Sequence, residues 1–222
     1  MKPSEYPTEY YSFDRYITKH RILTYWYQIR EVLELKPESV LEIGVGTGLV
    51  AAYLRNLGIR VTTLDINPTL NSDYVGSVLE ADQILRQTFD VVLCARVLHH
   101  LPFAQFSMAM EKIASVSASH AVITLPIEDM RFYLMTRYTA SPIRVLSLPL
   151  PLTLKKWIFQ FLKLDVKSEK FRSGQWKIND FSGIRLNDVV DGVSKNWIVK
   201  KQYRIPEDAS HFLMVLQKRD KE

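Results

Sequence analysis

The expected architecture follows from the segment Val40-Leu41-Glu42-Ile43-Gly44-Val45-Gly46-Thr47-Gly48. A short apolar run leads into three alternating glycines, and residues 49–57 then follow a helical pattern. Gly44 permits a tight turn, Gly46 lets a ligand approach the backbone, and Gly48 lets helix and strand pack closely. This order of strand, glycine turn and helix indicates a parallel α/β sheet that binds ligands at the carboxyl ends of its strands.

The remaining sequence alternates between apolar strands and helices, which indicates a sheet covered on both faces. Before the glycine segment, residues 15–35 are predicted to form a helix with an apolar stripe of Ile22, Trp26, Ile29 and Leu33. After it, we predict strands at 60–64, 74–75, 89–94 and 120–125, and a helix at 103–117 with Met108 and Met110 in the core. A last helix at 185–193 precedes strands at 197–203 and 211–216, joined by a turn that suits an antiparallel hairpin.

Composition indicates a soluble globular protein, because 47% of the residues are hydrophobic and 24% are charged. Cys94 is the single cysteine, so no disulfide can form within the chain. The polar start of the sequence does not read as a signal peptide, and the longest uncharged stretch, 113–127, is too short to cross a bilayer. We therefore expect a cytoplasmic protein.

The glycine segment favours a cationic nucleoside over a phosphate-rich ligand. Leu49 stands where a dinucleotide-binding segment would have its third glycine, and no Gly-Lys-Ser/Thr of a nucleotide P-loop follows. Asp65 ends the second strand, where a carboxylate can accept both hydroxyls of a ribose. Glu42 lies just before the glycines, where it would repel a pyrophosphate but attract a positive charge.

Four segments in this order resemble the class I S-adenosylmethionine-dependent methyltransferases, in particular the type-11 subgroup: Val40–Gly48, Leu64–Pro68, Phe89–Val92 and Val97–Pro102. The resemblance covers roughly residues 38–126. It implies an α/β, Rossmann-like, doubly wound sheet of seven strands with an antiparallel last strand, an N-terminal helix over the cofactor and a lid insertion before the last helix. We expect one methyltransferase domain, divided into an arm and helix (1–36), a cofactor-binding core (37–126), the insertion (127–177) and a closing helix and hairpin (178–222).

The same resemblance implies contacts with the cofactor S-adenosyl-L-methionine. Residues beside the methionine part would be Glu42, Gly44, Val45, Gly46, Ala95 and Arg96. Asp65 would hold the ribose and Ile66 would pack on the adenine. Ser77 stands where the family usually has an aspartate that contacts the adenine amino group, beside Val78, and Asp82 is the alternative.

The candidates for a general base are His99, His100 and Glu128. The two histidines can instead cap or pack against the following helix. Because they are adjacent, we expect their side chains to diverge and to form no metal site. Related quinone-biosynthesis methyltransferases commonly have Glu where this chain has His99. The absence of that Glu also argues against a metal here.

The net positive charge of the chain is concentrated in the insertion at 127–177. Between 131 and 177 the net charge is +8, whereas the rest of the chain has −3. Within it, 151–164 is predicted to contain a helix with Leu154, Trp157, Ile158, Phe161 and Leu162 on one face and lysines on the other. This helix can pack on the domain, close over an apolar pocket as a lid, or rest on an acidic membrane. A block containing Trp176 is expected to fold over the site.

The resemblance implies methyl transfer by in-line displacement, and we expect a small-molecule acceptor that is anionic or amphipathic. No nucleic-acid partner is expected, because the basic residues alternate with bulky aliphatic ones. A non-catalytic cofactor-binding protein that docks on a membrane or a partner is the alternative. A nicotinamide-dependent oxidoreductase is the third hypothesis.

Overall fold

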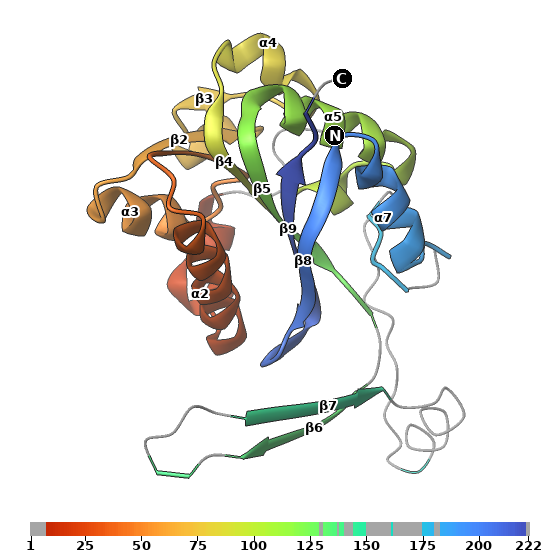
Figure 1. Ribbon diagram of the computed structural model, residues 1–222. Coiled ribbons are helices and arrows are strands. Elements are labelled where there is room, and N and C mark those ends of the chain that lie inside the picture. The colour runs from red at the N-terminus through yellow and green to blue at the C-terminus, as the bar shows by residue number, and fades with distance from the viewer. Residues whose placement is uncertain are drawn as a thin grey trace.

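Figure 1 shows the computed structural model, which describes residues 8–128, 131–136, 138–139, 144–149, 161, 175–179 and 183–220. Its main sheet has seven strands in the order β3-β2-β1-β4-β5-β9-β8. Strands β1 to β5 pair in parallel, and β9 runs antiparallel to both β5 and β8. This confirms the predicted fold. The strands are β1 Ser39–Ile43, β2 Arg60–Asp65, β3 Tyr74–Val75, β4 Phe89–Ala95, β5 Ser117–Pro126, β8 Trp197–Ile205 and β9 Asp208–Lys218.

Helices cover both faces of this sheet (Figure 1). The face with α2 (Lys19–Glu34) and α3 (Leu49–Asn56) encloses one core cluster, which includes Val32, Leu54 and Leu213. The opposite face packs against α4 (Ala81–Leu85), α5 (Phe106–Val116) and α7 (Leu186–Ser194), around Phe106 and Trp197. The core forms because each strand presents apolar side chains to both layers.

The predicted N-terminal helix is divided into α1 (Phe13–Tyr16) and α2, and Thr18 caps α2 by accepting a hydrogen bond from the Arg21 N–H at 3.3 Å. The predicted apolar stripe was wrong in part, because Ile22 and Trp26 are exposed. The buried face is instead mostly polar: Thr24, Tyr27, Gln28, Glu31 and Val32.

The polar face of α2 is buried because its partners on the sheet are polar. The Thr24 hydroxyl donates to Asp208 at 2.8 Å. The Glu31 carboxylate accepts hydrogen bonds from Lys201 and Tyr203. The core prediction for α5 also needs a correction: Met110 is fully buried, but Met108, two residues earlier and on another side of the helix, is 44% exposed.

Part of the insertion forms an antiparallel hairpin of β6 (Arg131–Thr136) and β7 (Arg144–Pro149), which was not predicted. The predicted helix at 151–164 lies outside the described residues except for Phe161, which is helical and exposed. Among the helices of the described ranges, none is both long and apolar enough to cross a bilayer.

Candidate active site

A cavity of about 860 Å³ lies at the carboxyl ends of β1, β2 and β4. The glycine turn, residues 44–48, forms the floor of this cavity. Residues of α1 and α2 line it from the other side. All ten residues proposed for the cofactor line this one cavity: Glu42, Gly44, Val45, Gly46, Asp65, Ile66, Ser77, Val78, Ala95 and Arg96.

The glycine turn leaves bare backbone facing the cavity. Gly44 has φ +87°, and a Cβ at this position would collide with Val97. Gly46 has φ +56°, and its missing Cβ would lie 3.7 Å from the Tyr11 ring and 3.8 Å from the Tyr16 hydroxyl. Both glycines therefore adopt a backbone conformation that other residues rarely adopt. Tyr11 and Tyr16, which also line the cavity, form a roof over the turn.

Asp65 connects the glycine turn to the end of β2. Its Oδ2 accepts a hydrogen bond from the Val45 N–H at 2.8 Å, and its Oδ1 accepts one from the Asn67 N–H at 2.8 Å. Each carboxylate oxygen has a second lone pair. Asp65 can therefore hold the turn in place and still accept hydrogen bonds from two ligand hydroxyls.

Glu42 is a buried carboxyl group with an unsatisfied oxygen. Its side chain is 4% exposed, and its Oε2 has no hydrogen-bond partner among the described residues. Burial raises the pKa of Glu42 to about 8; the positive charge of Arg55 opposes this rise, and the negative charge of Asp65 adds to it. A cation in the cavity would supply a positive charge that stabilises the ionised form of Glu42.

Ser77 has a local structural role as well as its place in the cavity. Its hydroxyl accepts a hydrogen bond from the Leu79 N–H at 3.2 Å, and the Glu80 carboxylate accepts one from the Ser77 N–H at 3.4 Å. Glu80 also lines the cavity and was missed, although the Ser-x-x-Glu spacing of this capping box is visible in the sequence. The alternative residue, Asp82, pairs with Lys112 at 2.6 Å and is not among the lining residues.

The two histidines line the cavity beside the end of β4. The prediction that their side chains diverge was wrong: the ring centroids are 4.0 Å apart, and Gln175 holds His100 through a 2.8 Å hydrogen bond to Nδ1. Burial, followed by the nearby His100, holds the pKa of His99 well below its usual range, so its imidazole is neutral near pH 7. The Nδ1 of His99 has no hydrogen-bond partner in the described part of the chain.

The segment around Trp176 borders the same cavity. The Trp176 indole is buried and donates to the Leu101 carbonyl at 2.9 Å, while Gln175 and Lys177 line the cavity. Glu128, the third base candidate, pairs with Lys177 at 3.4 Å and is not among the lining residues. Within the described ranges, no cluster of three or more His, Cys, Asp or Glu side chains could hold a metal ion.

Two arginines give the cavity a basic side. The Arg21 guanidinium lies over the Tyr16 ring at 3.6 Å from its centroid, and Arg96, with φ +59°, follows β4. Both line the cavity, and neither forms an ion pair with a described residue. Arg21 Nη1 and Arg96 Nε are buried without a hydrogen-bond partner in the same part of the chain. Burial lowers the pKa of Arg96, since it penalises the charged form. The cavity therefore combines an acidic side, at Glu42 and Asp65, with a basic one.

Proteins with this fold are found among known methyltransferases. A family model described as a methyltransferase domain matches residues 41–124, which contain the glycine turn, Asp65 and both histidines. This central segment of the chain is similar to a methyltransferase domain. Over 183 residues the protein is 26% identical to a mitochondrial ubiquinone biosynthesis O-methyltransferase of Schizosaccharomyces pombe. The match covers 74% of this chain and 62% of that protein. A ubiquinone biosynthesis O-methyltransferase of Methylobacterium nodulans is 34% identical over 85 residues, covering 32% of this chain and 34% of that protein.

The structure of magnesium protoporphyrin IX methyltransferase from Synechocystis, determined with bound S-adenosylhomocysteine, has a TM-score of 0.58 at 12% identity. The match covers 90% of this chain and 84% of that one. It shows that the two chains have the same fold. The chain spans less than two thirds of the length of either curated relative that it matches.

Proposed function

We propose that this protein is an S-adenosylmethionine-dependent methyltransferase that acts on a small-molecule acceptor. The observation that carries the proposal is the buried carboxyl group of Glu42, one oxygen of which has no hydrogen-bond partner among the described residues, beside a glycine turn held by Asp65 in the same cavity. This arrangement fits a ligand with a positive charge and a ribose. The methyltransferases with this fold, one of them bound to S-adenosylhomocysteine, support the same ligand.

The chain would mainly bind and align the reactants. A sulfonium donor is already activated for displacement, and positioning alone can contribute about 7–11 kcal/mol to such a reaction. In this proposal Asp65 accepts hydrogen bonds from the ribose hydroxyls, Ser77 and Glu80 face the adenine, and Glu42 faces the cationic part. The roof of Tyr11 and Tyr16 would exclude water from the donor.

An acceptor hydroxyl would need a base, and His99 fits this role. Its imidazole is neutral, it lines the cavity, and its Nδ1 is without a partner among the described residues. Both curated relatives are named as O-methyltransferases, which supports an oxygen acceptor. His100 is the second candidate. Glu128 does not line the cavity and would influence it only through its ion pair with Lys177.

The basic side of the cavity supports an anionic group on the acceptor. A buried guanidinium without a carboxylate partner is costly unless a ligand pairs with it, and this applies to Arg96 and, less strongly, to the one enclosed nitrogen of Arg21. Arg21 and Arg96 would accordingly bind the carboxylate of the donor's amino-acid part and an anionic group of the acceptor. Cytoplasmic location and membrane contact through 151–164 stay predictions.

Calorimetry followed by a transfer assay tests the proposal. The protein should bind both S-adenosylmethionine and S-adenosylhomocysteine, and it should transfer a labelled methyl group to a small molecule in a cell extract. Binding without transfer to any acceptor would favour the non-catalytic binding protein instead. Binding of NADH, with no heat from either sulfur nucleoside, would favour the oxidoreductase.

A further inference from the structure

The hairpin β6–β7 presents one continuous apolar face. In its antiparallel register Phe132 pairs with Leu148 and Leu134 with Leu146, and alternate residues of a strand share a face. These four side chains, here called the hairpin face, are 51%, 50%, 48% and 51% exposed in that order. Cross-strand partners on one face lie close enough to act as one patch.

In the described part of the chain, the four side chains of this face remain about half exposed. Each of the two strands packs mainly on the other, and Figure 1 shows the hairpin set apart from the seven-stranded sheet. Of the sixteen large hydrophobic side chains that are exposed in the described part of the chain, seven lie between 132 and 161. An isolated two-stranded hairpin is marginally stable in water. A patch of this kind marks an interaction surface.

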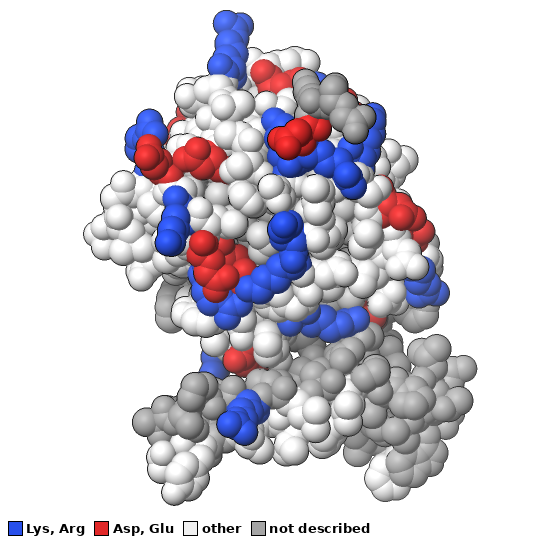
Figure 2. Space-filling view, in the orientation of Figure 1, with Lys and Arg blue, Asp and Glu red and all other residues white. Residues whose placement is uncertain are grey.

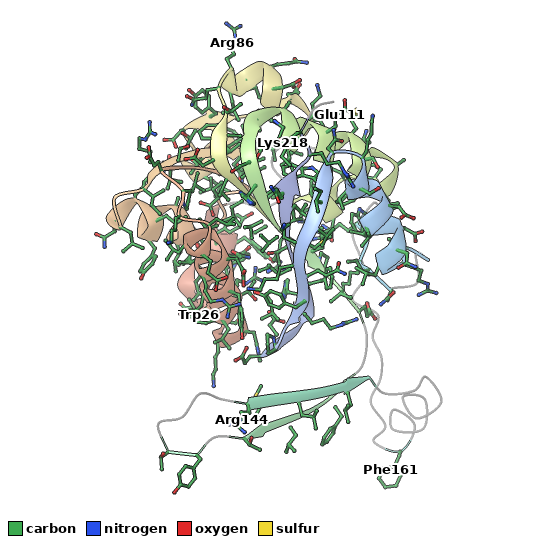
Figure 3. The ribbon with its side chains drawn as sticks, in the orientation of Figure 1. Trp26, Arg86, Glu111, Arg144, Phe161 and Lys218 are labelled. Carbon is green, nitrogen blue, oxygen red and sulfur yellow. The ribbon has the colours of Figure 1, made fainter. Side chains whose placement is uncertain are left out.

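The charge of the hairpin identifies the kind of partner. Residues 131–149 contain Arg131, Arg137 and Arg144 and no Asp or Glu. Arg144 lies on the hairpin, away from the sheet (Figure 3). Figure 2 shows a different pattern over the body of the protein, where basic and acidic side chains alternate. The hairpin thus combines arginines with exposed aliphatic side chains, and Tyr138, between the two strands, is 82% exposed. Arginine and tyrosine beside an apolar surface suit the boundary between lipid headgroups and acyl chains.

We propose that the hairpin β6–β7 docks the protein on a membrane surface that contains anionic lipids. The hairpin face would enter the outer part of the acyl region, and the arginines would pair with lipid phosphates. This surface is distinct from the predicted helix at 151–164, and docking here requires no methyl transfer.

Co-sedimentation of the full chain with lipid vesicles tests this proposal. Vesicles of phosphatidylcholine alone are compared with vesicles of equal parts phosphatidylcholine and phosphatidylglycerol, at low and high salt. We expect binding to the mixed vesicles, weaker binding to phosphatidylcholine, and a loss of about tenfold or more in the double variant Leu134→Asp/Leu146→Asp. The variant Arg144→Glu, which keeps the hairpin face, should lose affinity mainly for the mixed vesicles.

The double variant Leu57→Asp/Met108→Asp is the matched control, because these side chains are 48% and 44% exposed on the body of the protein. It should bind vesicles like the parent chain, and thermal unfolding shows whether each variant folds. Equal binding by the hairpin variant and the control would overturn the proposal, as would no binding to either vesicle. A dimer in sedimentation velocity that only the hairpin variant loses, without vesicle binding, would instead assign the face to a second copy of this chain.

Discussion

Glu42 should release its proton when a cationic ligand enters the cavity. Its pKa of about 8 means that at pH 7 about nine tenths of the ligand-free molecules carry a neutral carboxyl group. A sulfonium or ammonium charge placed beside the unsatisfied oxygen favours the ionised form, because opposite charges attract strongly in a buried site. Binding and deprotonation are therefore linked.

The size of the effect follows from Coulomb's law. A unit positive charge about 5 Å from the carboxylate, at an effective dielectric constant of about 20, stabilises it by about 3 kcal/mol. This is roughly a hundredfold change in the acid dissociation constant of Glu42. Linkage then predicts release of about 0.8 proton per ligand at pH 7, and an affinity that rises by about 50-fold from pH 6 to pH 9.

Calorimetry in buffers of different ionisation enthalpy measures the protons released. Glu42→Gln removes the titrating group while keeping the shape of the side chain, so the difference between the two proteins isolates Glu42 from the ligand's own amine. S-adenosylhomocysteine, which lacks the sulfonium charge, should release fewer protons than S-adenosylmethionine. If the parent chain and Glu42→Gln release the same number of protons, the argument from Glu42 fails.

The other predictions concern ligand affinity and stability. Asp65→Asn should weaken binding of S-adenosylhomocysteine by about 1.5–3 kcal/mol, the usual cost of losing hydrogen bonds to a charged group, and an unchanged dissociation constant in calorimetry would contradict its role. Gly44→Ala should lower the free energy of unfolding by about 2 kcal/mol more than Gly58→Ala, because both glycines have positive φ but only the first would collide with a neighbour; equal losses in urea unfolding would count against the collision. Glu31→Ala should cost about 1.5–3 kcal/mol, the usual contribution of hydrogen bonds to a charged group, because the buried Glu31 carboxylate accepts such bonds from the partly exposed Lys201 and Tyr203. Burial opposes ionisation of Glu31, but hydrogen bonds from Arg30, Lys201 and Tyr203 leave its pKa below its usual value, so this stabilisation is present above the unfolded pKa and should fade as the pH falls through the folded one; a cost that is equal at pH 7 and pH 3 would refute this assignment.

The parallel part of the sheet could be predicted because most of its strands are short segments of apolar and β-branched residues with a clear end. The bounds of β3 agree with the prediction residue for residue. The buried face of α2 could not be predicted in the same way. Hydrophobic periodicity selects Ile22 and Trp26, whereas the sheet offers polar partners that bury Gln28 instead. The hairpin was missed because residues 131–136 are mostly apolar and show no alternation between two kinds of side chain.

The cavity could be predicted only where one segment contains both the strand end and the loop that follows it. Asp65 and the glycine turn are of this kind, since their positions relative to the sheet follow from the order of the chain. Arg21 reaches the same cavity from α2, and no local pattern shows where that helix will lie. Gln175, which forms a hydrogen bond with His100, is likewise distant from it in sequence.

The tyrosine roof has a consequence for the rate of the proposed reaction. Tyr11 and Tyr16 lie within van der Waals distance of a Cβ placed on Gly46, so a nucleoside beneath them would be enclosed by a segment that precedes the sheet in the chain. The spent nucleoside would have to leave before another donor arrives, and each turnover would include a displacement of residues 11–16, which contain both roof tyrosines. The speed of that displacement then sets a ceiling on kcat, whatever the acceptor.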